Sequence, residues 1–96
     1  MSMLPIARVV RSVQYGTITA AGSSNTATIT SVNTAKSVVN FLGMTNGVTD
    51  TPGGTSIAIG AFYGRLTLTN ATTVTCARGN GTDATCIMSF VVVEYW

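Results

Sequence analysis

The stretch that decides the fold is Ala84-Thr-Cys-Ile-Met-Ser-Phe-Val-Val-Val-Glu-Tyr95. From Ile87 onward, apolar residues stand at both odd and even positions, a pattern typical of a strand that is buried on two sides. One face of this strand would fill the core of the domain, and the other would lie in a subunit interface. The segment therefore predicts both a β-rich fold and an association surface.

A second apolar run, Thr72 to Arg78, precedes this strand, and Gly79-Asn-Gly-Thr-Asp83 separates the two. Because Gly and Asn tolerate positive φ, we predict a β-hairpin. A turn centred on Gly81 would place Cys76 opposite Cys86, so that a cross-strand disulfide is geometrically feasible. The alternative, two small reduced thiols in the core, has equal weight for a protein made in a reducing compartment.

The rest of the chain also has the pattern of short strands. Residues 8 to 20 alternate and break at Gly16, which predicts two strands or one strand with a bulge. Further strands are expected at 26–32, 36–43, 57–63 and 65–70, with the longest loop from Met44 to Ser56. We expect an all-β fold, a compact antiparallel β-sandwich or jelly-roll of about six to eight short strands. With 96 residues, it would form one domain, 8–96, after an N-terminal arm, 1–7.

The composition favours self-association. Apolar residues make up 46% of the chain and charged residues only 8%, whereas an average soluble domain has about 25% charged residues. Because so few charges cannot easily keep a monomer dispersed, we expect other subunits to cover much of the surface, although a threonine-coated monomer is the alternative. The net charge of +2 is spread along the chain, which argues against nucleic acid as a partner.

The residues needed for catalysis are scarce, so we expect no enzyme activity. The chain has no histidine, and with it the commonest general base and metal ligand is missing. Its only carboxylate side chains are Asp50, Asp83 and Glu94, of which the two aspartates lie in expected turns. The glycine-rich segment 51–56 lacks the Lys-Ser/Thr of a phosphate-binding loop, and two cysteines alone cannot complete a zinc site. We therefore predict no cofactor and no metal.

The two ends carry the expected assembly contacts. The first residues lack the pattern of a signal peptide, and no apolar stretch is long enough to span a bilayer, so we expect synthesis in a cytoplasm and no membrane partner. In the N-terminal arm and the first strand, Pro5 fixes an extended backbone, and Arg8 and Arg11 supply positive charge for acidic partners. Tyr95 and Trp96 are residue types enriched at interfaces, or they plug the end of the sandwich.

Three stretches carry a family resemblance: Val10-Arg-Ser-Val-Gln-Tyr-Gly-Thr-Ile18, residues 26–43, and residues 65–75 together with Ser89-Phe-Val-Val-Val-Glu94. They resemble small bacteriophage and prophage virion structural proteins of β-sandwich type. The resemblance covers most of the chain but not the cysteine pair or the loop at 44–56. It implies a virion component, made in the host bacterial cytoplasm, that assembles as a homotrimer and binds the major capsid protein or other virion proteins.

Within this class we favour a capsid decoration protein that stabilises the head lattice. The low charge, the missing histidine and the β-rich composition all fit a structural role without a catalytic site. The alternative is a tail-fibre or receptor-binding module that contacts the host surface. A weaker similarity to trimeric sugar-binding sandwiches keeps a lectin-like role open, for which Phe62-Tyr63 with Arg65 is the only aromatic and polar cluster.

Overall fold

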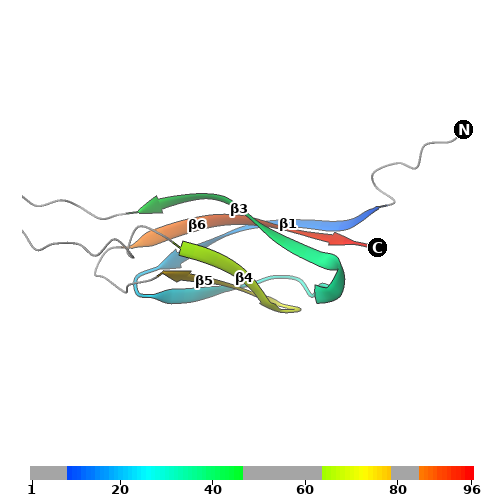
Figure 1. Ribbon diagram of the computed structural model, residues 1–96, viewed down its shortest axis with the longest axis horizontal. Coiled ribbons are helices and arrows are strands. Elements are labelled where there is room, and N and C mark those ends of the chain that lie inside the picture. The colour runs from blue at the N-terminus through cyan, green and yellow to red at the C-terminus, as the bar shows by residue number, and fades with distance from the viewer. Residues whose placement is uncertain (1–8, 47–63, 79–84) are drawn as a thin grey trace, which may run out of the picture.

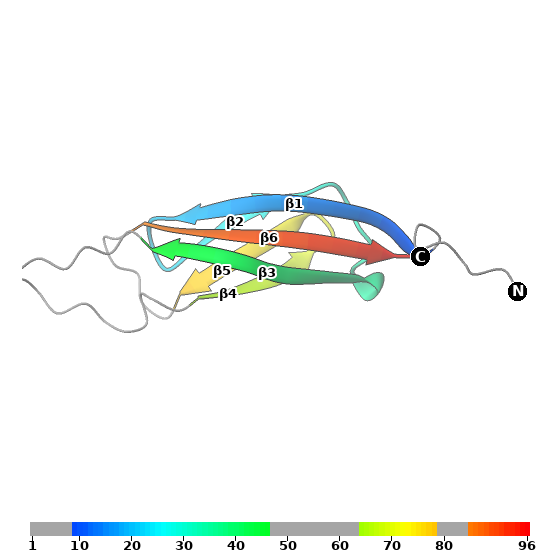
Figure 2. The ribbon, with the colours of Figure 1, turned by 90° about the horizontal axis from the view of Figure 1, so that it is seen from above.

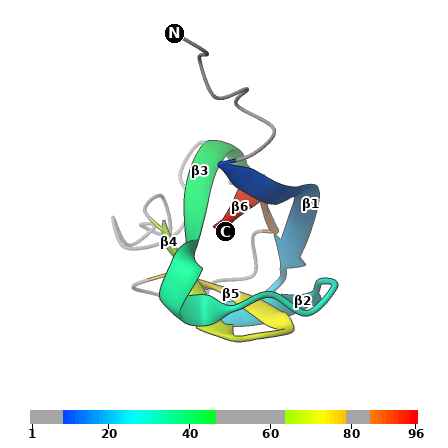
Figure 3. The same ribbon diagram turned by 90° about the vertical axis from the view of Figure 1, so that its right-hand side faces the viewer.

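The computed structural model describes residues 9–46, 64–78 and 85–96. In this part of the chain, six antiparallel strands form two three-stranded sheets that pack face to face. Figures 1 and 2 show the two layers from the side and from above, and Figure 3 shows them from one end. The expected all-β sandwich is confirmed.

Sheet A contains β1 (Val10–Ala20), β6 (Cys86–Tyr95) and β3 (Ser37–Asn46), with β6 in the centre. Sheet B contains β2 (Ser24–Thr28), β5 (Thr73–Arg78) and β4 (Gly64–Asn70), with β5 in the centre. A three-residue 3-10 helix, η2 (Thr34–Lys36), leads into β3, and the Asn33 side chain caps it by accepting from the Ala35 N–H. The two central strands, β5 and β6, contain most of the buried positions of the sandwich.

The core lies between the inner faces of the two sheets. In β1, β5 and β6 the residues of this core all have even numbers, because side chains on one face of a strand recur at every second residue. The largest fully buried side chains are Phe90, Ile18, Met88, Val74, Val92, Cys76 and Cys86. Half-buried Ala27, Ile29, Val39, Met44, Leu66 and Leu68 pack around them. Ala27 and Ile29 face this core, whereas the threonines between and beside them are exposed.

The predicted break at Gly16 is wrong, because β1 continues through this residue as one strand. Gly16 pairs with Phe90, and a Cβ built on it would lie 2.5 Å from Phe90 Cζ. The glycine therefore makes room for the phenylalanine ring. The bulge that the alternating pattern also allowed is present, but it lies between Val10 and Ser12, at Arg11.

The predicted hairpin of Thr72–Arg78 with Ala84–Tyr95 is also wrong. β5 pairs with β2 and β4, whereas β6 pairs with β1 and β3, so the chain crosses from one sheet to the other between them. Cys76 stands opposite Asn25 and Leu66, and Cys86 opposite Ala20 and Asn46. Glycine and asparagine favour a tight change of direction but do not determine whether the next strand joins the same sheet or the facing one.

Other boundaries differ by a few residues from those expected. β3 continues to Asn46, so the expected loop from Met44 begins later. β2 ends at Thr28, before the expected Val32, and η2 precedes β3, so β3 begins at Ser37 and not at residue 36. The remainder of that loop, the expected strand at 57–63, the segment 79–83 and the arm at 1–7 lie outside the described residues.

Candidate functional site

The exposed large hydrophobic side chains of the described residues lie on the strands of sheet A or directly next to them. Residues paired directly across an antiparallel sheet share a face, and the outward rows are Val13–Val93–Val38, Tyr15–Val91–Asn40, Thr17–Ser89–Gly43 and Thr19–Ile87–Thr45. None of these residues is charged. The apolar side chains gather toward Tyr95 and the polar ones toward the opposite end of the strands. We call this surface the A face.

Exposure on the A face is unusual for side chains of this kind. Val13, Val38, Ile87 and Tyr95 are all exposed, and Tyr15 is 75% exposed. Val91, between Tyr15 and Asn40 in the register, is only 8% exposed although it points away from the core. At the edge of the sheet, Phe41 and Leu42 are exposed beside a bulge in β3. Contiguous exposed apolar surface of this kind marks a site of protein association.

The outer face of sheet B has the opposite character. Its rows include Thr26–Thr75–Thr67 and Ser24–Ala77–Arg65, and the hydroxyl groups of Thr69 and Thr75 lie 2.5 Å apart in a hydrogen bond. Threonine suits a strand while presenting a polar group to water. One molecule thus has a threonine face and an apolar face, and this asymmetry selects the A face as the candidate binding surface.

A polar cluster adjoins the apolar end of the A face. The bulge in β1 turns Arg11 toward Glu94, whose Oε1 lies 3.8 Å from Arg11 Nε. The Arg11 guanidinium also lies over the Trp96 ring, 4.8 Å from its centroid, in a cation–π contact. The backbone N–H of Trp96 donates to the Val9 carbonyl at 3.0 Å, which holds this residue against the start of β1.

Glu94 is the buried anchor of this cluster, since it points to the inner side of β6 and is only 5% exposed. Its Oε2 accepts from the backbone N–H of Asn33 at 2.7 Å, and its Oε1 accepts from the Ser12 hydroxyl at 3.0 Å. The hydrogen bond from the Asn33 N–H lowers the pKa of the Glu94 carboxyl, with help from Ser12 and Arg11 and against the effect of burial. The carboxylate therefore fixes the chain before η2 to the end of β6.

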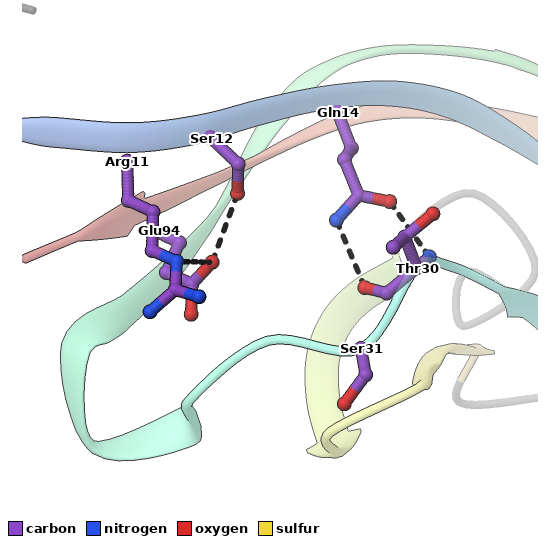
Figure 4. Close-up of a pocket in the computed structure, with 6 residues that line it drawn as sticks. All are labelled: Arg11, Ser12, Gln14, Thr30, Ser31 and Glu94. Carbon is purple, nitrogen blue, oxygen red and sulfur yellow. Dashed lines mark hydrogen bonds and ion pairs between the residues drawn. The ribbon is translucent and has the colours of Figure 1, made fainter.

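A polar cleft opens between β1 and the chain that follows β2 (Figure 4). Its volume is about 380 Å³, and it is lined by Arg11, Ser12, Gln14, Thr30, Ser31 and Glu94. On one side the Gln14 amide bonds the Thr30 backbone twice: Nε2 donates to Thr30 O at 2.9 Å, and Oε1 accepts from Thr30 N at 2.8 Å. Gln14 thus substitutes for a peptide group and joins the edges of the two sheets.

The buried thiols and Arg78 lie at the opposite end of the core. Cys76 and Cys86 are free thiols with no exposed surface, on strands of facing sheets. Burial raises the pKa of the Cys86 thiol; the nearby Arg78 charge opposes this rise, and Cys76 adds to it. The Arg78 guanidinium donates to the carbonyl of Gly22 at 2.7 Å through Nη2 and 3.1 Å through Nε. Arg78 therefore clamps the turn between β1 and β2.

The structure brings three of the predicted assembly residues together: Arg11, Tyr95 and Trp96 lie at one end of sheet A. Tyr95 and Trp96 are exposed, Trp96 by 61%, so they do not plug the sandwich. Pro5 and Arg8 lie outside the described residues. Sequence reasoning did not single out Val13, Val38, Gln14 or Arg78, and it considered Glu94 only as a catalytic acid. The inward orientation of Glu94 and Arg78 could have been predicted from the sequence, because each stands two residues after an inward-facing apolar residue of its strand.

Within the described ranges no group of histidine, cysteine, aspartate and glutamate side chains is placed to hold a metal ion. No helix in those ranges has the length and apolar character needed to cross a membrane. Comparison with protein families, curated proteins and solved structures found no match for the chain. What the fold and surface define is a small β-sandwich with one uncharged apolar face.

Proposed function

We propose that this protein is a structural assembly protein whose copies associate through the A face as a homotrimer, and that this homotrimer binds other protein surfaces. The observation that carries the proposal is the uncharged outer face of sheet A, on which Val13, Val38 and Tyr15 are exposed around the buried Val91. Closely spaced valines and an aromatic residue make the kind of apolar centre found in subunit interfaces.

The dimensions of the A face suit an interface. Three strands spaced by about 4.8 Å, each of about ten residues that rise about 3.3 Å, span roughly 14 by 33 Å. The projected area is about 500 Å², and the relief of the side chains adds to it, which approaches the roughly 800 Å² per partner of a standard interface. A partner that covered the A face would bury Tyr15 and the valines without desolvating a charge.

The setting that we propose is the virion, in which the protein is a capsid decoration protein that stabilises the head. The family resemblance of the β1, β3 and β6 segments supports this setting. A cement protein has to bind several neighbouring subunits at once, and multivalent binding by a trimer raises its avidity without new contacts in each protomer. Tyr95, at the end of the A face, would extend the contact.

The experiment compares phage particles that carry the wild-type protein, no protein, or the Val38→Lys variant. We expect heads without the protein, or with the variant, to release DNA at a lower temperature than wild-type heads, while adsorption to host cells is unchanged. Thr67→Lys on the threonine face is the matched control and should protect heads like the wild type. Full head stability with loss of adsorption would overturn the proposal in favour of a tail-fibre module.

A further inference from the structure

We propose that the polar cleft between β1 and Ser31 binds a saccharide unit through its neighbouring hydroxyl groups. This site is separate from the A face and does not depend on the assembly function. It also differs from the cluster of Phe62, Tyr63 and Arg65 considered above: Arg65 lies on β4 of sheet B and does not line the cleft, and Phe62 and Tyr63 lie outside the described residues.

The Arg11 side chain is held in place by its neighbours, and its guanidinium keeps hydrogen-bond donors that the described residues do not use. Arg11 forms the ion pair with Glu94 and the contact with Trp96, yet within the described residues its guanidinium donates no hydrogen bond. A guanidinium offers five N–H donors in a fixed plane. Trp96 lies against one face of that plane and Nε lies nearest to Glu94, so the terminal nitrogens keep donors for a ligand in the cleft that Arg11 lines (Figure 4).

Hydrogen bonds within the protein already hold the Glu94 and Gln14 side chains that line the cleft. Glu94 is fixed by Asn33 and Ser12, and Gln14 is fixed by its two hydrogen bonds with Thr30. Figure 4 shows these two pairs on opposite sides of the cleft, with Ser31 on the segment that runs between them. A ligand would therefore enter a preorganised site and pay little for ordering it.

The paired charges at the cleft favour an uncharged ligand. Because the Arg11 cation and the Glu94 anion lie together, their fields largely cancel for a ligand at the cleft, and neither an anion nor a cation is favoured. The same pair offers donors from Arg11 and acceptor lone pairs from the carboxylate. A neutral group that both accepts and donates fits such a pair, and neighbouring hydroxyl groups on a sugar ring supply this chemistry.

Size and surroundings agree with this class of ligand. A volume of about 380 Å³ falls near the lower end of the range of about 300 to 1,000 Å³ for small-molecule sites. Trp96, which stacks with the cleft residue Arg11, is 61% exposed and offers an aromatic surface to the C–H groups of a sugar bound beside Arg11. The remaining lining residues, Ser12, Thr30 and Ser31, are all polar.

Trp96 is the only tryptophan in the chain, and it stacks with Arg11 of the cleft, so its fluorescence reports a change in the position of that guanidinium. The assembled wild-type protein would be titrated with D-glucose, D-galactose, D-mannose and N-acetylglucosamine, one at a time, into the millimolar range. We expect a saturable change in fluorescence with at least one sugar, together with saturation transfer from the protein to the protons of that sugar in NMR spectra.

Two variants locate the response. Arg11→Met removes the donors and Ser31→Met fills the cleft from an exposed position, and both should weaken the apparent affinity at least tenfold while the melting temperature stays close to that of the wild type. Arg65→Met, an exposed arginine on the other sheet, should bind like the wild type. No saturable response to any of the four sugars, or a response that both cleft variants retain, would overturn the proposal. The particle experiment above is unaffected by either outcome, so the two proposals fail separately.

Discussion

Gly16 lies directly under the ring of Phe90, in the strand register and in space. An added methyl group there would overlap the ring, since its carbon would be 2.5 Å from Cζ and 2.9 Å from Cε1. The ring is 1% exposed and is surrounded by the core, so it has little room to move.

Gly16→Ala should therefore lower the free energy of unfolding by about 1 to 3 kcal/mol, the usual cost of overpacking a core. Gly43→Ala is the matched control, because a Cβ at Gly43 meets nothing within 4 Å. Urea denaturation would measure both. If the overlap is the cause, Phe90→Leu should cost less in the Gly16→Ala background than in the wild type. Equal effects of the two glycine substitutions would contradict the packing explanation.

The Gln14 amide should matter more than its partly exposed position suggests. Gln14→Ala removes both hydrogen bonds to the Thr30 backbone, and at about 0.5 to 1.5 kcal/mol for each bond we expect a loss of about 1 to 3 kcal/mol. Thr17→Ala, at an exposed position of the same strand, is the control and should change stability by much less. Backbone amide exchange at Thr30 should accelerate in Gln14→Ala alone, and unchanged protection there would argue against the sheet-joining role.

Glu94 should make the protein sensitive to acid. Its pKa in the folded protein is lowered from the ordinary value of 4.5, mainly by the Asn33 N–H. Since the folded pKa is depressed, the stabilisation is fully present above the unfolded pKa and is lost as the pH falls through the folded pKa. Glu94→Gln should be less stable than the wild type at pH 7, and this difference should shrink below pH 4.5. Urea midpoints between pH 7 and pH 2.5 test this, and a difference that does not change with pH would contradict it.

The two cysteines should be unreactive in the folded protein. Both have no exposed surface, and burial raises the pKa of Cys86, which reduces its thiolate fraction. Labelling by a thiol-specific disulfide reagent at pH 7.5 should therefore be slow for the native protein and fast in denaturant. If the cysteines also fail to label in denaturant, the protein contains the disulfide between Cys76 and Cys86 that the sequence left as an alternative. Mass spectrometry under non-reducing conditions distinguishes the two outcomes.

The sequence was sufficient for the β-sandwich because strand periodicity and threonine content are local signals. It also predicted that β6 is apolar on both faces: one face lies in the core, and the other forms the middle of the A face. The pairing partners of β5 and β6 were predicted wrongly, because two runs around a glycine-rich turn look the same whether they share a sheet or face each other. The A face depends on this pairing: Val13 and Val38 join Val93 in one row only once the register is known.

The polar sites were partly accessible to sequence reasoning. Arg78 follows Val74 and Cys76, and Glu94 follows Phe90 and Val92, at steps of two residues, so each charge could have been assigned to the inner face. Their partners could not, because the carbonyl of Gly22 and the N–H of Asn33 belong to the backbone of distant segments. The cleft likewise depends on Gln14 reaching the backbone of Thr30, a contact that no residue pattern indicates.

The central claim is that the A face holds copies of this protein together. Light scattering after size-exclusion chromatography would measure the mass of the wild type, of Val13→Lys on β1 of the A face, and of Thr26→Lys on β2 of the threonine face. Both substitutions place the same charge at an exposed position in an edge strand. We predict three times the monomer mass of 9.9 kDa for the wild type and for Thr26→Lys, and a folded monomer for Val13→Lys. A monomeric wild type at micromolar concentration, or a Val13→Lys variant that stays assembled, would contradict the account.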